Sequence, residues 1–180
     1  MTDERKRTTV LGIAFLILLA LSSVESTVFF RFLSDILSNK ILAVGILFTH
    51  NILVVSLILL GMTFYVNLVQ AGFFKREKHA NIVLDHPRTF ASVFTIMIVF
   101  LSILRGSSLL GGITVEALPL ILLVSAPVGI VEGYGIYLTI EKTLSRAISM
   151  KHLAYIYSVF FIAAIMEVGF INLLVWVTAQ

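Results

Sequence analysis

ILAVGILFTHNILVVSLILLGMTFYVNLVQAGFF, residues 41–74, is the stretch that decides the fold class. It is longer than the roughly 20 apolar residues that a membrane-spanning helix needs. The composition of the whole 180-residue chain also indicates membrane-spanning helices, because 59% of the residues are hydrophobic and only 13% are charged. Soluble domains have about 45–50% apolar and about 25% charged residues. The composition therefore excludes a water-soluble enzyme, a disordered chain and a nucleic-acid-binding module, and it indicates an integral membrane protein.

The apolar runs predict one all-α domain, residues 1–180, built as a polytopic transmembrane helix bundle. Lipid permits only helices or closed barrels, and these runs are too long and continuous for barrel strands. The polar triplet Thr49, His50 and Asn51 interrupts the quoted stretch, so we expect a short interfacial or re-entrant helix over 41–48 before the next span. About five spans are expected, at residues 8–30, 51–73, 90–110, 116–140 and 152–177.

Lys and Arg residues are shared unequally between the two sides that these spans define. With the N-terminus inside, ten of the 13 fall in inside segments and three in outside segments, Arg31, Lys40 and Arg105. Positive charge concentrates on the cytoplasmic side of membrane proteins. We therefore expect a multi-pass protein of the cytoplasmic membrane with its N-terminus inside and its C-terminus outside. We expect the net charge of +3 on the chain to face anionic lipid headgroups, and we expect no nucleic acid as a partner.

No pattern in the sequence points to catalysis or to a cofactor. The chain has no cysteine, which excludes disulfides, thiolate metal sites and cysteine nucleophiles. It has no GxSxG turn, phosphate-binding loop, GxGxxG fingerprint or HExxH pair. The expectation is a protein that is not an enzyme and has no catalytic residues, cofactor or metal.

Two carboxylates fall inside the expected spans and form the centre of the candidate site. Glu132 lies near the middle of 116–140 and Glu167 near the middle of 152–177. An ionisable side chain at this depth costs several kcal/mol and is a functional candidate by default. The alternative is that each carboxyl group hydrogen-bonds a neighbouring helix and has only a structural role in holding the helices together. His50 and Asn51 complete the candidate polar core, and further possible partners are Asn67, Gln70 and Asn172.

Pro127 and two glycines precede or flank Glu132. Proline removes a backbone donor, so we expect a kink or break in the helix at Ala126. Gly129 and Gly133 form a GxxxG pair, which allows another helix to approach closely. A broken helix beside a carboxylate is typical of transporter sites, and the same residues are also typical of a tight structural contact.

The segment Ala126–Glu132, APVGIVE, resembles the fourth-span signature of the stage II sporulation protein M family. The closing segment Ala163–Ile171, AAIMEVGFI, is similar to that family's last helix, and His50–Asn51 before a long span is similar to its Asn-Asn start. Val128 departs from the pattern, since the family usually has His there. The resemblance implies a multi-span membrane protein of poorly defined activity, whose relatives in spore formers scaffold cell-wall hydrolases.

Three functions stay in competition at this level. The favoured one is a membrane scaffold or assembly partner that binds another membrane protein and forms a homo-oligomer within the lipid bilayer. The alternative is a small transporter or channel component that uses Glu132 and Glu167. The weakest is an intramembrane enzyme acting on a lipid, because no metal-diphosphate motif accompanies the acidic groups.

Overall fold

The computed structural model describes residues 3–37, 39–73, 82–109 and 118–178, with side chains described over 6–29, 39–73, 82–102 and 126–172. Within these ranges every regular element is a helix, which confirms the all-α fold class. The helices are α1 (Asp3–Leu37), α2 (Lys40–Gln70), α3 (Ile82–Asp85), α4 (Pro87–Leu109), α5 (Leu118–Leu144) and α6 (Met150–Thr178).

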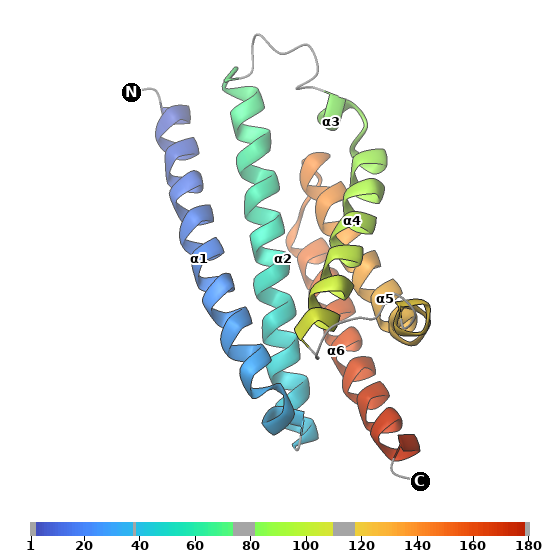
Figure 1. Ribbon diagram of the computed structural model, residues 1–180. Coiled ribbons are helices and arrows are strands. Elements are labelled where there is room, and N and C mark those ends of the chain that lie inside the picture. The colour runs from blue at the N-terminus through green and yellow to red at the C-terminus, as the bar shows by residue number, and fades with distance from the viewer. Residues whose placement is uncertain (1–2, 38, 74–81, 110–117, 179–180) are drawn as a thin grey trace.

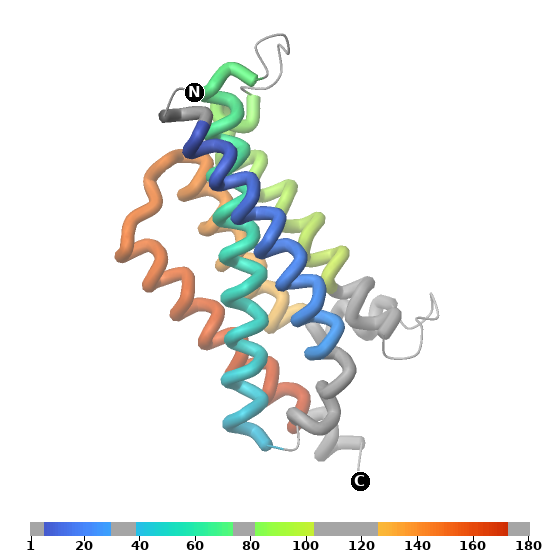
Figure 2. The backbone as a smooth tube through the Cα atoms, turned by 90° about the vertical axis from the view of Figure 1, so that its left-hand side faces the viewer, coloured from blue at the N-terminus to red at the C-terminus, as the bar shows by residue number. Residues whose placement is uncertain are grey.

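Three helices, α2, α5 and α6, pack against one another and form the centre of the bundle (Figure 1). α1 packs on α2 at one side, and α4 packs on α5 at the other. The long helices run alternately up and down, so the two termini lie at opposite ends of the bundle (Figures 1 and 2). A side chain on the inner face of α2, α5 or α6 is therefore surrounded by protein.

Three stretches of the described chain are long and apolar enough to cross a membrane: Lys6–Phe29, Lys40–Gln70 and Met150–Asn172. Pro87–Ser102 in α4 is a shorter apolar stretch. Many large apolar side chains on these helices are exposed, including Leu16 at 63% and Ile96 at 70%. Such a surface suits contact with lipid rather than water.

The expected separate helix over 41–48 is wrong, because α2 is continuous from Lys40 to Gln70. The polar triplet does not end the helix, since each of its side chains has a partner. Thr49 donates its hydroxyl to the Gly45 carbonyl of the same helix at 2.8 Å. His50 and Asn51 make contacts with other helices that are described below. Of the kink or break expected at Ala126, the break is wrong, because α5 continues through Pro127, and the kink stays a prediction. Residues 110–117, which join the expected spans 90–110 and 116–140, lie outside the described residues.

Local signals define the helix ends. Asn39 caps α2 by accepting a hydrogen bond from the Leu42 amide at 3.2 Å. At the other end of α2, Gly72 has φ 71°, and Phe73 N–H donates to the Leu68 carbonyl at 3.1 Å. This is a Schellman motif, which requires a left-handed residue after the last turn.

α5 ends in the same motif but with an arginine in the left-handed position. Arg146 has φ 55°, and Ala147 N–H donates to the Lys142 carbonyl at 2.9 Å. With the Gln70 amide oxygen turned toward the guanidinium, Arg146 Nε lies 3.0 Å from that oxygen. The contact joins the ends of α2 and α5. It holds Arg146 in a left-handed backbone conformation that residues other than glycine rarely adopt.

Glycines set how closely α1 and α2 approach. A Cβ at Gly61 of α2 would lie 2.9 Å from the Phe15 ring of α1, and a Cβ at Gly12 of α1 would lie 3.0 Å from the Phe64 ring of α2. Each phenylalanine thus occupies the space above a glycine on the other helix. The two rings stack with their centroids 6.4 Å apart.

Candidate functional site

The three central helices each contribute one polar side chain to the same layer of the bundle. Asn51 of α2 donates its amide Nδ2–H to Oε1 of Glu132 of α5 at 3.2 Å. Glu167 of α6 lies at the same level, since its neighbours Ala164 and Val168 cluster with Leu47, one turn before Asn51 on α2. Asn51 is buried and both glutamates are partly buried. The structure therefore brings together Asn51, Glu132 and Glu167, three of the residues that the sequence singled out.

Apolar clusters lie on both sides of this polar layer. On α2, Leu47 and Val55 stand one turn before and one turn after Asn51 on the same face. Leu47 belongs to a cluster with Ala164 and Val168 of α6. Val55 belongs to a second cluster, with Ile136, Ile140, Ile156 and Phe160 among its buried members. The two carboxyl groups are therefore held in a layer whose neighbours offer little compensation for a buried charge.

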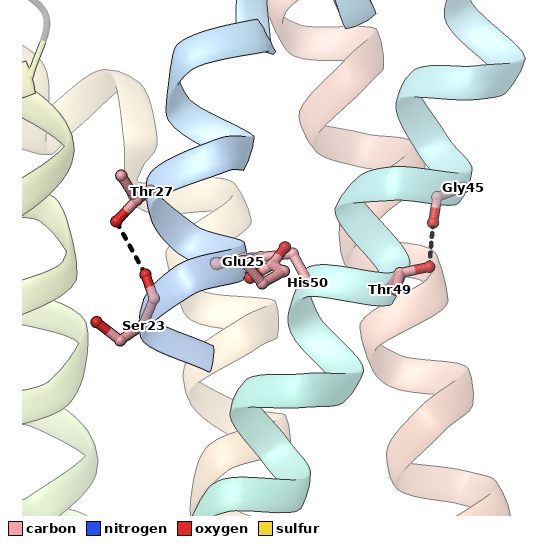
Figure 3. Close-up of polar contacts among 6 residues, drawn as sticks. All are labelled: Ser23, Glu25, Thr27, Gly45, Thr49 and His50. Atoms are coloured by element: carbon pink, nitrogen blue, oxygen red, sulfur yellow. Dashed lines mark hydrogen bonds and ion pairs between the residues drawn. The ribbon is translucent and has the colours of Figure 1, made fainter. Parts of the chain in front are cut away.

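A second polar contact lies beside the first, between α1 and α2. His50 Nδ1 is 2.9 Å from Oε2 of Glu25, with the two side chains 19% and 25% exposed. The Phe29 ring stacks on the imidazole at a centroid distance of 4.8 Å and an interplanar angle of 11°. Figure 3 shows Glu25 of α1 directed at His50 of α2, whereas Thr27 bonds a carbonyl of its own helix. His50 therefore pairs with Glu25 of α1, a residue outside the polar core that the sequence predicts.

Glu25 is the site residue that sequence reasoning missed. A signal was present, because Glu25 lies in the polar second half of the first expected span, 8–30, just as Glu132 lies within the expected span 116–140. Its partner could not be read from the sequence, since pairing depends on how α1 and α2 are rotated. His50 and Asn51 are consecutive on α2, so their side chains diverge by about 100° and serve two different neighbours.

The other polar candidates make contacts outside this layer. The amides of Asn67 and Asn172 donate to carbonyls one turn earlier in their own helices, those of Thr63 and Val168, both within 2.8 Å. Gln70 faces Arg146 at the end of the bundle. Within the described chain, no group of three His, Asp or Glu side chains is arranged to hold a metal ion.

The glycines of α5 pack differently from the sequence expectation. Gly129 and Gly133 face α4, where a Cβ would lie 3.8 Å and 3.4 Å from the Val99 side chain. These are loose or ordinary contacts, so this pair does not enforce a close approach. Gly135 does, because a Cβ there would lie 2.5 Å from the Phe160 ring of α6. The sequence gives little sign of this, since Gly135 lies outside the GxxxG pair.

Comparison with protein-family models, curated proteins and solved structures finds no match to this chain. The functional argument therefore rests on the geometry of the polar layer.

Proposed function

We propose that this chain is a membrane transport component that moves protons through the polar layer of Asn51, Glu132 and Glu167. The observation that carries the proposal is the placement of two partly buried carboxyl groups, Glu132 and Glu167, among three packed apolar helices. Intramembrane acidic side chains are expensive to bury and mark proton relays and ion pathways in membrane proteins. An interhelical lock needs only an amide or a hydroxyl, whereas a pair of carboxyl groups can also take up and release a proton.

The direct test is flux through the purified protein in liposomes. Vesicles carry a pH-sensitive dye inside and receive an imposed potential, and proton entry is followed by fluorescence. Protein-containing vesicles are expected to acidify faster than protein-free vesicles of the same lipid. Parallel vesicles with sodium or potassium gradients identify the ion. Equal rates with and without the protein, for every ion, would reject transport by this chain.

A membrane scaffold is the second candidate, and the resemblance of the Ala126–Glu132 segment to the stage II sporulation protein M family favours it. This segment contains Gly129, which faces α4, and Glu132, which binds α2, so it organises the bundle. Crosslinking in native membranes, purification and mass spectrometry test this candidate. A specific membrane partner that is lost in the Glu132→Gln variant supports a scaffold, and recovery of only a monomer rejects it.

The proposed orientation places the N-terminus in the cytoplasm, with the α1–α2 turn outside and the α5–α6 connection inside. The chain has no cysteine, so single cysteines report position without background. Asn39 and Ser145 are both exposed and lie in these two connections. In intact cells, an impermeant maleimide is expected to label Asn39→Cys and to spare Ser145→Cys until the cells are opened. The reverse pattern would invert the orientation.

A further inference from the structure

An apolar groove lies between α1, α2, α3 and α4, outside the polar layer. Its volume is about 380 Å³, within the range of sites that bind small molecules. Phe15 of α1 and Phe94 of α4 contribute to its walls, and Gly61 of α2 lines it where a side chain would meet Phe15. Tyr65 of α2, Val83 of α3 and Phe90 of α4 also line the groove. Almost all of the lining is apolar, so the groove suits a hydrocarbon chain.

The groove lies in the part of the bundle nearest the N-terminus of α1. Phe15 follows Lys6 by nine residues, or about 13 Å along a helix. Val83 belongs to α3 and Phe90 to the first turns of α4, which begin at the same end (Figure 1). One leaflet of a bilayer has a hydrocarbon depth of about 15 Å, half of the full core. The groove therefore falls within a single leaflet, at the depth of its acyl chains.

Exposed basic side chains lie at this end of the bundle, on the first turns of α1 and α4. Lys6 and Arg7 on α1 are exposed, and Arg88 at the start of α4 is 83% exposed. The Arg88 guanidinium is 3.9 Å from Glu141, a carboxylate that Lys142 already contacts at 2.9 Å. Exposed basic residues at a membrane surface attract anionic lipid headgroups by about 1 kcal/mol each.

We propose that the groove binds one acyl chain of an anionic phospholipid, whose headgroup lies against Arg7 and Arg88. The apolar lining favours a hydrocarbon chain, the depth places that chain in the leaflet next to the α1 N-terminus, and the exposed basic residues at this end of the bundle favour a negatively charged headgroup. The site is separate from Asn51, Glu132 and Glu167, so it stands whether or not the chain moves protons.

Native mass spectrometry of the delipidated full-length protein tests this site. The probes are phosphatidylglycerol and phosphatidylcholine with identical acyl chains. One phosphatidylglycerol adduct is expected at a concentration roughly thirtyfold lower than that needed for phosphatidylcholine, as two basic contacts of about 1 kcal/mol each imply. Equal binding of the two lipids would overturn the proposal.

Variants separate the groove from general lipid adhesion. Val83→Phe fills the groove and is expected to remove the adduct, whereas Ile130→Phe adds the same kind of bulk on an exposed face of α5 and leaves the adduct in place.

Arg88→Gln, an exposed change that does not disturb the core, is expected to reduce the preference for phosphatidylglycerol, and Lys151→Gln on α6 is its control. An adduct unchanged in Val83→Phe and Arg88→Gln rejects the site. A dimer that replaces the lipid adduct and is lost in Val83→Phe would assign the groove to a second copy of the chain.

Discussion

Gly135→Leu is expected to prevent recovery of a monodisperse protein, and Gly135→Ala to lower its melting temperature. A Cβ at Gly135 would lie 2.5 Å from Cε2 and 2.8 Å from Cζ of Phe160. Phe160 is only 2% exposed and is packed in the larger apolar cluster, so its ring has little room to turn away. Overpacking of this kind costs about 1–3 kcal/mol, and each kcal/mol corresponds to roughly 2–4 °C for a chain of this size.

Thermal unfolding in one detergent, followed by circular dichroism or a dye, measures the effect. Gly169→Ala is the matched control, because it changes a helical glycine that has nothing within 4 Å of the added carbon. That control is expected to melt at or above the wild-type temperature, since alanine favours the helix. Adding Phe160→Leu to Gly135→Ala is expected to recover part of the loss. A Gly135→Ala protein as stable as the wild type would show that α5 and α6 do not depend on this approach.

Glu132→Gln is expected to reduce proton flux by roughly 100-fold, the order seen when a proton-transferring side chain is removed. Glutamine keeps the size of the side chain and an oxygen that can accept the hydrogen bond from Asn51. It cannot take up and release a proton. The substitution therefore removes the proposed chemistry while leaving the helix contact in place.

Flux and stability must be read together for this variant. Its melting temperature is expected to stay close to that of the wild type, and Glu132→Asp is expected to retain part of the flux. Glu141→Gln is the matched control on the same helix, because Glu141 contacts Lys142 at 2.9 Å and is remote from the polar layer in sequence. A folded Glu132→Gln protein with wild-type flux would remove Glu132 from the pathway. Loss of both stability and flux in Glu132→Gln, with Glu141→Gln unaffected, would instead assign Glu132 to holding the bundle together.

Hydropathy was sufficient to predict the helices. A long apolar run in a chain this hydrophobic can satisfy its backbone hydrogen bonds in lipid only as a helix or as part of a closed barrel. The prominence of Asn51, Glu132 and Glu167 also followed from sequence, since polar groups in such runs are rare. Their contacts did not follow, because the rotation and depth of each helix are set by packing. His50 shows this clearly. It pairs with Glu25 of α1, whereas the sequence predicts that it lies with Glu132 of α5 and Glu167 of α6.

The continuous α2 shows a second limit of sequence reasoning. Thr49, His50 and Asn51 read as an interruption because each is unfavourable in lipid when considered alone. In the bundle, one bonds its own helix, one contacts α1 and one contacts α5. Tertiary partners thus remove the reason for a break, and no local pattern indicates that they exist.

The pairing of Glu25 with His50 has a consequence for biogenesis. When α1 leaves the ribosome, its carboxylate precedes its partner by 25 residues. A lone charge in a span raises the cost of insertion by about 2.5–3.5 kcal/mol on translocon scales. That cost falls once His50 of α2 has also reached the bilayer. The first two helices are therefore expected to leave the translocon together as a hairpin, with the Glu25–His50 contact already formed between them.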